Sequence, residues 1–140
     1  MILLNKIGQI ELLEKFFGQL AITQTVADEF NKPLPDWINI DTFNSGEIKG
    51  FASFLDLGEA TSIALASTNE NSLLIIDESK GRKVAKEMGV QITGSLGLLV
   101  AAKQKGYIEA VKPILEKIQQ TNFRISENLI QVVLNKVNES

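Results

Sequence analysis

The sequence predicts an α/β protein with a short parallel sheet, and three neighbouring segments carry this prediction. Leu73–Ile76 is an unbroken apolar run of strand length, which is typical of a strand with helices on both faces. Leu57–Ser67 before it and Ser79–Met88 after it are helical in composition, and Val90–Thr93 forms a second short strand. Strand, helix and strand in this order indicate parallel pairing with a right-handed crossover.

The chain begins with helical periodicity. Apolar residues mark one helix face at Ile7, Ile10, Leu13 and Phe17. The short apolar run Leu20–Ile22 follows, and Thr23 suits the cap of a helix that continues to about Phe30. The segment Pro33–Asp36 ends this helix, because proline cannot continue it. Trp37–Ile40 is then expected to form a short strand, and Ile48–Leu55 to form a helix.

Caps and breakers define the elements of the second half. Ser79 can cap the helix that runs to Met88. Gly89 suits the position directly after the end of this helix. A helix from Ser95 to about Gln104 is followed by Gly106. Two further helices are predicted, one with Pro113 in its first turn and ending near Gln120, and one capped by Ser126 and ending near Asn138.

Length and composition narrow the class of protein. The chain has 140 residues, which suits a single domain spanning residues 1–140. It contains no Cys and no His, which excludes thiolate nucleophiles, thiolate zinc sites, Ser-His-Asp triads and His-ligated metals. Carboxylates holding a hard cation such as Mg²⁺ or Mn²⁺ remain open. No apolar stretch approaches membrane-spanning length and no secretory leader is evident, so we expect no membrane association and a cytoplasmic location.

Charge is distributed unevenly along the chain. Residues 1–78 hold 12 acidic and 4 basic residues, a net of −8, whereas residues 79–140 hold 5 acidic and 10 basic residues, a net of +5. The densest basic cluster contains Lys80, Arg82, Lys83 and Lys86, directly after Asp77 and Glu78. This juxtaposition suits a polyanion such as RNA, with Lys80, Arg82 and Lys83 as nucleic-acid-binding candidates. An ordinary solvated helix face is the alternative interpretation.

Asp77 and Glu78 are candidate site residues because of their place in the predicted sheet. Both follow directly after the strand that ends at Ile76, and ligands of parallel sheets bind beyond the carboxyl ends of the strands. The alternative is structural, since Asp77 is also suited to capping the next helix. Glu59 opens the preceding helix, where an acid is stabilised by the helix dipole whether or not it has another role.

Several short motifs occur along the chain in a particular order. They are Leu55–Ala60 (LDLGEA), Leu73–Glu78 (LLIIDE), Gly81-Arg82 with Ala85, Gly89–Gly97 (GVQITGSLG), Ala102-Lys103 with Gly106, Lys6–Gly8 and Phe123–Ser126. Together these segments resemble PIN (PilT N-terminal) domains. They are most similar to an uncharacterised PIN-like subfamily of predicted nucleic-acid-binding proteins related to VapC-type toxins. The resemblance covers nearly the whole chain, and the order and spacing of the segments carry it.

The resemblance implies a three-layer α/β/α fold and a metal-dependent ribonuclease. By the family pattern, Glu59, Asp77 and Glu78 match acidic residues that bind Mg²⁺ or Mn²⁺ and serve catalysis, and Arg82 matches a basic position in the following helix. RNA is then the expected substrate, and an antitoxin protein is an expected partner. The bound metal activates water and offsets charge on the phosphoryl oxygens.

Two departures from the family pattern favour an alternative function. The family's first strand, with its acidic residue, is missing from this chain, and Thr93–Ser95 stand where active members often place an Asp. A catalytically inactive RNA-binding or protein-interaction module is therefore the second hypothesis. The missing strand leaves three alternatives. The sheet closes without it, or a second chain covers the exposed edge of the sheet in a homo-oligomer. The third alternative is that the native start of the chain lies upstream.

Overall fold

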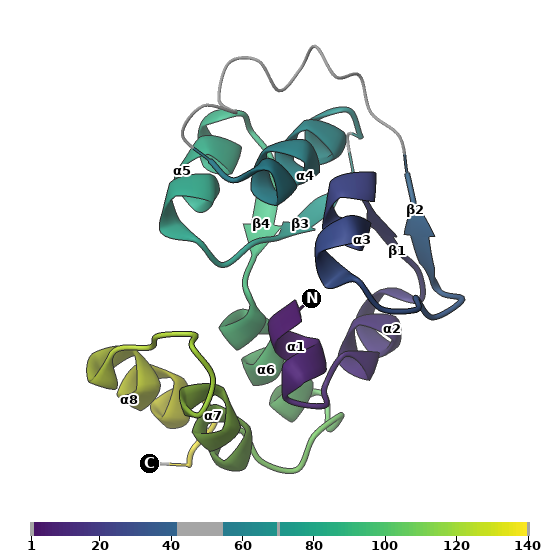
Figure 1. Cartoon of the computed structure of the whole chain (residues 1–140). Helices are drawn as coiled ribbons and strands as arrows, with labels where there is room; N and C mark the ends of the chain where they lie inside the picture. The colour runs from purple at the N-terminus through teal and green to yellow at the C-terminus, as the bar shows by residue number, and fades with distance from the viewer. Residues whose placement is uncertain (1, 42–54, 70, 140) are drawn as a thin grey trace. The chain divides into compact units, whose positions relative to one another are not determined.

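A computed structural model describes residues 2–41, 55–69 and 71–139. The described elements, in chain order, are α1 (Ile2–Lys6), α2 (Glu11–Phe17), β1 (Leu20–Ile22), α3 (Gln24–Phe30), β2 (Ile38–Ile40), α4 (Leu57–Ser67), β3 (Leu73–Ile75), α5 (Ser79–Glu87), β4 (Gln91–Thr93), α6 (Ser95–Gln104), α7 (Lys112–Gln119) and α8 (Glu127–Lys136). Helices alternate with short parallel strands (Figure 1), as expected for an α/β PIN-like fold.

The chain divides into two compact units, and the strands all belong to one of them. The first unit comprises Met1–Phe17 and Ser95–Ser140, and the second comprises Gly18–Gly94. The described strands of the second unit form two parallel pairs, β1 with β2 and β3 with β4, in place of one continuous sheet. The register pairs Ala21 with Asn39 in one sheet and Leu74 with Ile92 in the other.

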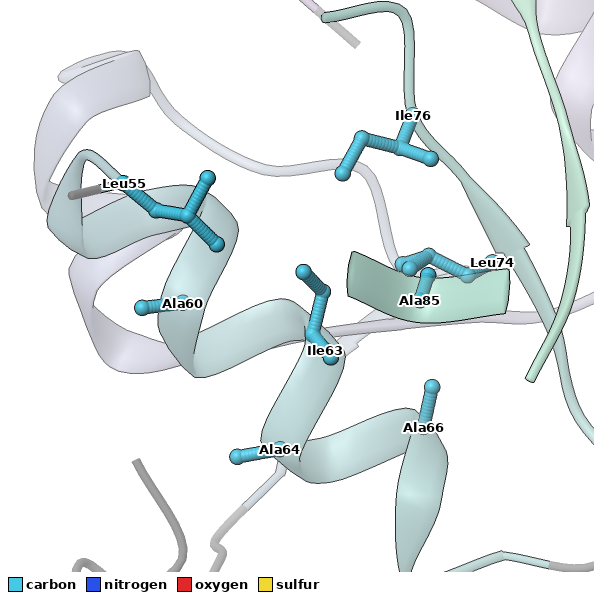
Figure 2. Close-up of a cluster of buried hydrophobic side chains, with 8 residues drawn as sticks. All are labelled: Leu55, Ala60, Ile63, Ala64, Ala66, Leu74, Ile76 and Ala85. Atoms are coloured by element: carbon cyan, nitrogen blue, oxygen red, sulfur yellow. The ribbon is translucent and has the colours of Figure 1, made fainter. Parts of the chain in front are cut away.

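The core of the Gly18–Gly94 unit lies between α4, β3 and α5. Its fully or nearly fully buried side chains are Leu55, Ala60, Ile63, Ala64, Ala66, Leu74, Ile76 and Ala85. Figure 2 shows Ile63 of α4 in one cluster with Leu74 of β3 and Ala85. The small residues of α4 let the helix approach the strand closely, and the burial of Ile63 and Leu74 contributes roughly 1.5–3 kcal/mol for each side chain. This packing fixes where the first turns of α4 and α5 lie.

A buried pair of threonines links β1 and α3 to α4 within the same unit. Thr23 follows β1 and caps α3, with its hydroxyl accepting a bond from the Val26 N–H at 3.2 Å. The Thr23 and Thr61 hydroxyl oxygens are 2.8 Å apart, and Thr61 lies 3.1 Å from the Gly58 carbonyl. Since the Thr61 proton is donated to Gly58, Thr23 donates to Thr61. The pair fixes α3 beside α4.

The other unit is helical, and its packing includes a cap supplied from the end of the chain. The Glu139 carboxylate accepts bonds from the N–H groups of Val111 at 2.8 Å and Lys112 at 3.0 Å. Val111 supplies no side-chain cap of its own at the start of α7, so Glu139 satisfies the free N–H groups there. Lys103 lies 3.5 Å from the same carboxylate. The end of α8 is thereby tied to α6 and α7.

Most elements agree with the sequence-based expectations, but the first predicted helix does not. A continuous helical face through Ile7 and Phe17 was expected, but the structure has α1 and α2 separated at Gly8, whose φ is 73°. The helix expected at 48–55 falls almost entirely outside the described residues. The cap of α5 is Glu78, one residue before the expected Ser79. Within the described ranges, no helix is long and apolar enough to cross a membrane.

Candidate active site

The acidic residues near the start of α4 are placed by the cap of that helix. Asp56 is the N-cap, and its carboxylate accepts a bond from the Glu59 N–H at 3.0 Å. Glu59 therefore lies in the first turn of α4, where the free N–H groups of the helix favour a negative charge. Asp56, which sequence analysis did not select as a site residue, lies beside a predicted one.

A glycine on α5 makes room for the Glu59 carboxylate. A Cβ at Gly81 would lie 2.6 Å from Glu59 Oε2 and 2.5 Å from Ile76 Cδ1, so no larger residue fits there without movement. Gly81 is buried in the first turn of α5. Glu78, the exposed N-cap of the same helix, makes no side-chain capping bond. The structure thus brings the starts of α4 and α5 together around Glu59.

Glu29 adds an acid from α3 that sequence analysis missed. Its carboxylate accepts a hydrogen bond from the Gly58 backbone. A Cβ at Gly58 would lie 2.6 Å from Glu29 Oε2, so a second glycine admits a second carboxylate. No local pattern marks Glu29, because Asp28 and Glu29 together resemble a solvated helix end. Only the packing of α3 against α4 reveals its position.

The charges of these acids act on one another, and Glu59 is affected most. Burial, the hydrogen bond to Asp56 and the negative charges of Asp56, Glu78 and Glu29 raise the pKa of Glu59 to about 7. Burial and the charge of Asp56 raise the pKa of Glu29, and the bond from Gly58 partly offsets them. We call Glu29, Asp56, Glu59 and Glu78 the acidic cluster. Such mutual repulsion is relieved when a cation binds.

Asp77 and Arg82 lie at a different point, beside Gly94. A Cβ at Gly94 would lie 3.0 Å from Asp77 Oδ1 and 2.8 Å from Arg82 Nη1, so both charged groups border this glycine. Arg82 Nη1 also donates to the Ile76 carbonyl at 2.9 Å. The structure therefore groups Glu59 with Glu78 and places Asp77 with Arg82.

The remaining predicted basic residues are solvent-exposed on α5. Lys80 and Lys83 are both exposed, as is Lys86 in the last turn, whereas Arg82 is half-buried. Two lysines free to reach solvent at the start of the helix suit contact with a phosphate backbone. The guanidinium of Arg82 already makes a hydrogen bond within the protein.

The acidic cluster fits a divalent cation in its donor chemistry and charge. Mg²⁺ and Mn²⁺ prefer oxygen ligands, and four carboxylates supply them. In the part of the chain that the structure describes, however, no three acidic residues gather closely enough to hold an ion. Binding would require the side chains of the acidic cluster to draw together, which the repulsion between them opposes until a cation is present.

The fold and site together define a class: a small α/β protein with short parallel strands and acidic residues within electrostatic reach of one another at the end of α3 and the starts of α4 and α5. A family model described as a PIN domain (DUF3368) matches residues 1–139. The chain therefore belongs to this PIN domain family, which is of the nucleic-acid-binding, nuclease-like class and generally depends on divalent metal ions. No curated protein and no solved structure matches the chain significantly.

Proposed function

We propose that this protein binds RNA in the cytoplasm and hydrolyses its phosphodiester bonds with the help of Mg²⁺ or Mn²⁺. One observation supports this most: the acidic cluster brings Glu29, Asp56, Glu59 and Glu78 together from the end of α3 and the starts of α4 and α5. The family match over residues 1–139 supports a single PIN domain as the functional unit.

Glu59 and Glu78 are the proposed metal ligands, with Glu29 or Asp56 as the third acid. Asp77, predicted from the family pattern as a metal ligand and catalytic residue, remains a proposed site residue, although it borders Gly94. When bound, the cation lowers the pKa of a water molecule and offsets charge on the phosphoryl oxygens. The chain's own acids orient the cation, and Lys80, Lys83 and Arg82 are proposed to attract the phosphate backbone.

Cleavage of single-stranded RNA tests this proposal. The purified protein is incubated with labelled RNA and Mn²⁺, in parallel with the variants Glu59→Gln, Glu78→Gln, Asp77→Asn and Glu87→Gln. Glu87 is an exposed acid at the far end of α5 and serves as the matched control. We expect cleavage by the native chain and Glu87→Gln, and a loss of about 100-fold in Glu59→Gln.

Two results would contradict the nuclease proposal. Equal cleavage by all of the variants would mean that a contaminant degrades the RNA. No cleavage by the native chain in either Mg²⁺ or Mn²⁺, with RNA binding retained, would instead support the second candidate function.

The second candidate is an RNA-binding or protein-interaction module without turnover. It is favoured by the absence of three closely gathered acids among the described residues. Binding that weakens with salt, without cleavage in Mn²⁺, would support the RNA-binding form, because phosphate contacts release counterions. Binding to a protein partner without any RNA affinity would support the other form.

A toxin-like role with an antitoxin protein as partner is a further part of the proposal. It is supported by the nuclease-like class of the family. Expression of the native chain in a bacterial host should arrest growth, and expression of Glu59→Gln should not. Growth unaffected by the native chain would contradict the toxin role while leaving RNA cleavage open.

A homo-oligomer is proposed from the strand pairing. Among the described residues, β1 pairs only with β2 and β3 only with β4, so each strand has one edge that no other described strand pairs with. Sedimentation at micromolar concentration should therefore show a mass above 15.4 kDa. A well-folded monomer would contradict this proposal.

A further inference from the structure

The helical unit carries an aromatic patch outside the acidic cluster. It contains Phe16 and Phe17 at the end of α2 and Tyr107 after α6. The Phe16 and Tyr107 ring centroids are 5.2 Å apart in an edge-to-face arrangement, and those of Phe16 and Phe17 are 5.9 Å apart. Phe17 is 36% exposed, and the other two rings are half-buried. The patch therefore presents ring surface to solvent.

The turn after α6 explains why Tyr107 reaches this patch. Gly106 adopts a φ of 79°, which ends the helix, and the Tyr107 N–H then donates to the Ala102 carbonyl at 2.8 Å. Tyr107 is thereby folded back onto Phe16. The backbone turn at the end of α6 therefore determines where the Tyr107 ring lies.

Two exposed lysines accompany the rings. Lys15 Nζ lies 6.0 Å from the centroid of Tyr107, and Lys105 Nζ lies 5.8 Å from that of Phe16. Among the described residues of this unit, Lys103 forms an ion pair with Glu139, and this pair involves neither Lys15 nor Lys105. The acids of α2 are Glu11, one helical turn before Lys15, and Glu14, directly before it, and both precede the two phenylalanines.

This combination suits one class of ligand. Proteins that bind single-stranded nucleic acid stack bases on aromatic rings and hold the backbone with nearby cations. The two lysines lie over the other rings, which leaves Phe17 as the ring for a base. A protein partner would use an apolar surface here but would not require aromatic rings with an exposed lysine beside two of them.

We propose that Phe16, Phe17, Tyr107, Lys15 and Lys105 form a binding surface for single-stranded RNA, on which a base stacks against Phe17. The inference rests on the proposed function, because it names the form of RNA that the protein takes. It adds a surface on the helical unit that is made of residues other than the acids of the candidate site.

Fluorescence anisotropy with labelled single-stranded RNA in EDTA tests the surface without cleavage. We expect Phe17→Ala to weaken binding about tenfold, and Phe17→Trp to bind at least as tightly as the native chain. Lys105→Ala should reduce the slope of log affinity against log salt by about 0.7. The controls Leu129→Ala and Lys136→Ala remove an exposed apolar residue and an exposed lysine of α8, and both should bind normally.

The outcomes separate this inference from the proposed function. If Phe17→Ala binds RNA with native affinity, the proposed binding surface is contradicted, whatever the cleavage assay shows. Loss of RNA binding in Phe17→Ala but not in Phe17→Leu also overturns base stacking, since leucine has no aromatic face, and would indicate an apolar contact instead. Patch-dependent binding by a chain that never cleaves RNA would support the surface and contradict the nuclease.

Discussion

The carboxylate of Glu59 occupies the space that a side chain at Gly81 would need. A Cβ at Gly81 would come within 2.6 Å of Glu59 Oε2. This close approach between the first turns of α4 and α5 is what places Glu59 within electrostatic reach of Glu78. The acidic cluster thus depends on a glycine that carries no chemistry of its own.

Substitution of Gly81 is expected to disturb both packing and the acidic cluster. In Gly81→Ala the new methyl group would meet Glu59 and also Ile76 Cδ1 at 2.5 Å. We expect a loss of about 1–3 kcal/mol in the free energy of unfolding, measured by urea denaturation. Lys83→Ala, an exposed change on the same helix, should alter stability by less than about 0.5 kcal/mol. Native stability in Gly81→Ala would show that the two helices are further apart.

The raised pKa of Glu59 predicts that stability falls as the pH rises. The carboxyl titrates near 4.5 when unfolded and at about 7 in the folded chain, so the folded state holds the proton more tightly. Its contribution is fully present below pH 4.5 and is lost as the pH rises through about 7. Glu59→Gln should therefore be more stable than the native chain at pH 8, by about 1 kcal/mol after solvent screening, and equal to it at pH 4. A difference that does not change with pH would contradict the assignment.

The lowered pKa of Glu139 predicts that its contribution to stability is lost as the pH falls, which is the opposite of the Glu59 case. Burial alone would raise its pKa, but the bonds from the Val111 and Lys112 N–H groups and the charge of Lys103 lower it. Its contribution is present above the ordinary pKa and is lost as the pH falls through the lowered one. Glu139→Gln should cost about 1–2 kcal/mol at pH 7 and progressively less as the pH falls below 4.5, by thermal denaturation. A cost that does not change with pH would mean that charge is not involved.

The buried threonine pair should behave as a coupled unit. Thr61→Val removes the bonds to the Gly58 carbonyl and to Thr23, and should cost about 1–3 kcal/mol of stability. Because Thr23 loses its acceptor in that variant, adding Thr23→Val should cost less than it does in the native chain. A double-mutant cycle from urea denaturation measures this coupling. Strict additivity would contradict a direct hydrogen bond between the two hydroxyl groups.

Local sequence signals were sufficient for most of the fold. The helix Leu57–Ser67 and the Thr23 cap were predicted correctly because periodicity and capping act over a few residues. The break at Gly8 was missed, since apolar residues on both sides fit one helical face. The cap that Glu139 gives to Val111 joins residues far apart in the chain, which no local pattern reveals.

The candidate site was predicted less fully than the fold. The family pattern selected Glu59 and Glu78, and the structure places these two within electrostatic reach of each other. It could not reveal Glu29, because the packing of α3 on α4 decides that position. The family pattern also did not distinguish Asp77 from its neighbour Glu78. In the structure Asp77 borders Gly94, whereas Glu78 is the N-cap residue of α5.

Calorimetric titration with Mn²⁺ tests most directly whether the acidic cluster binds a divalent cation. We expect saturable binding to the native chain, binding at least about tenfold weaker in Glu59→Gln, and native binding in Glu87→Gln, whose exposed acid lies at the far end of α5. Equal Mn²⁺ affinity in the native chain and Glu59→Gln, or no binding to the native chain at all, would contradict the account.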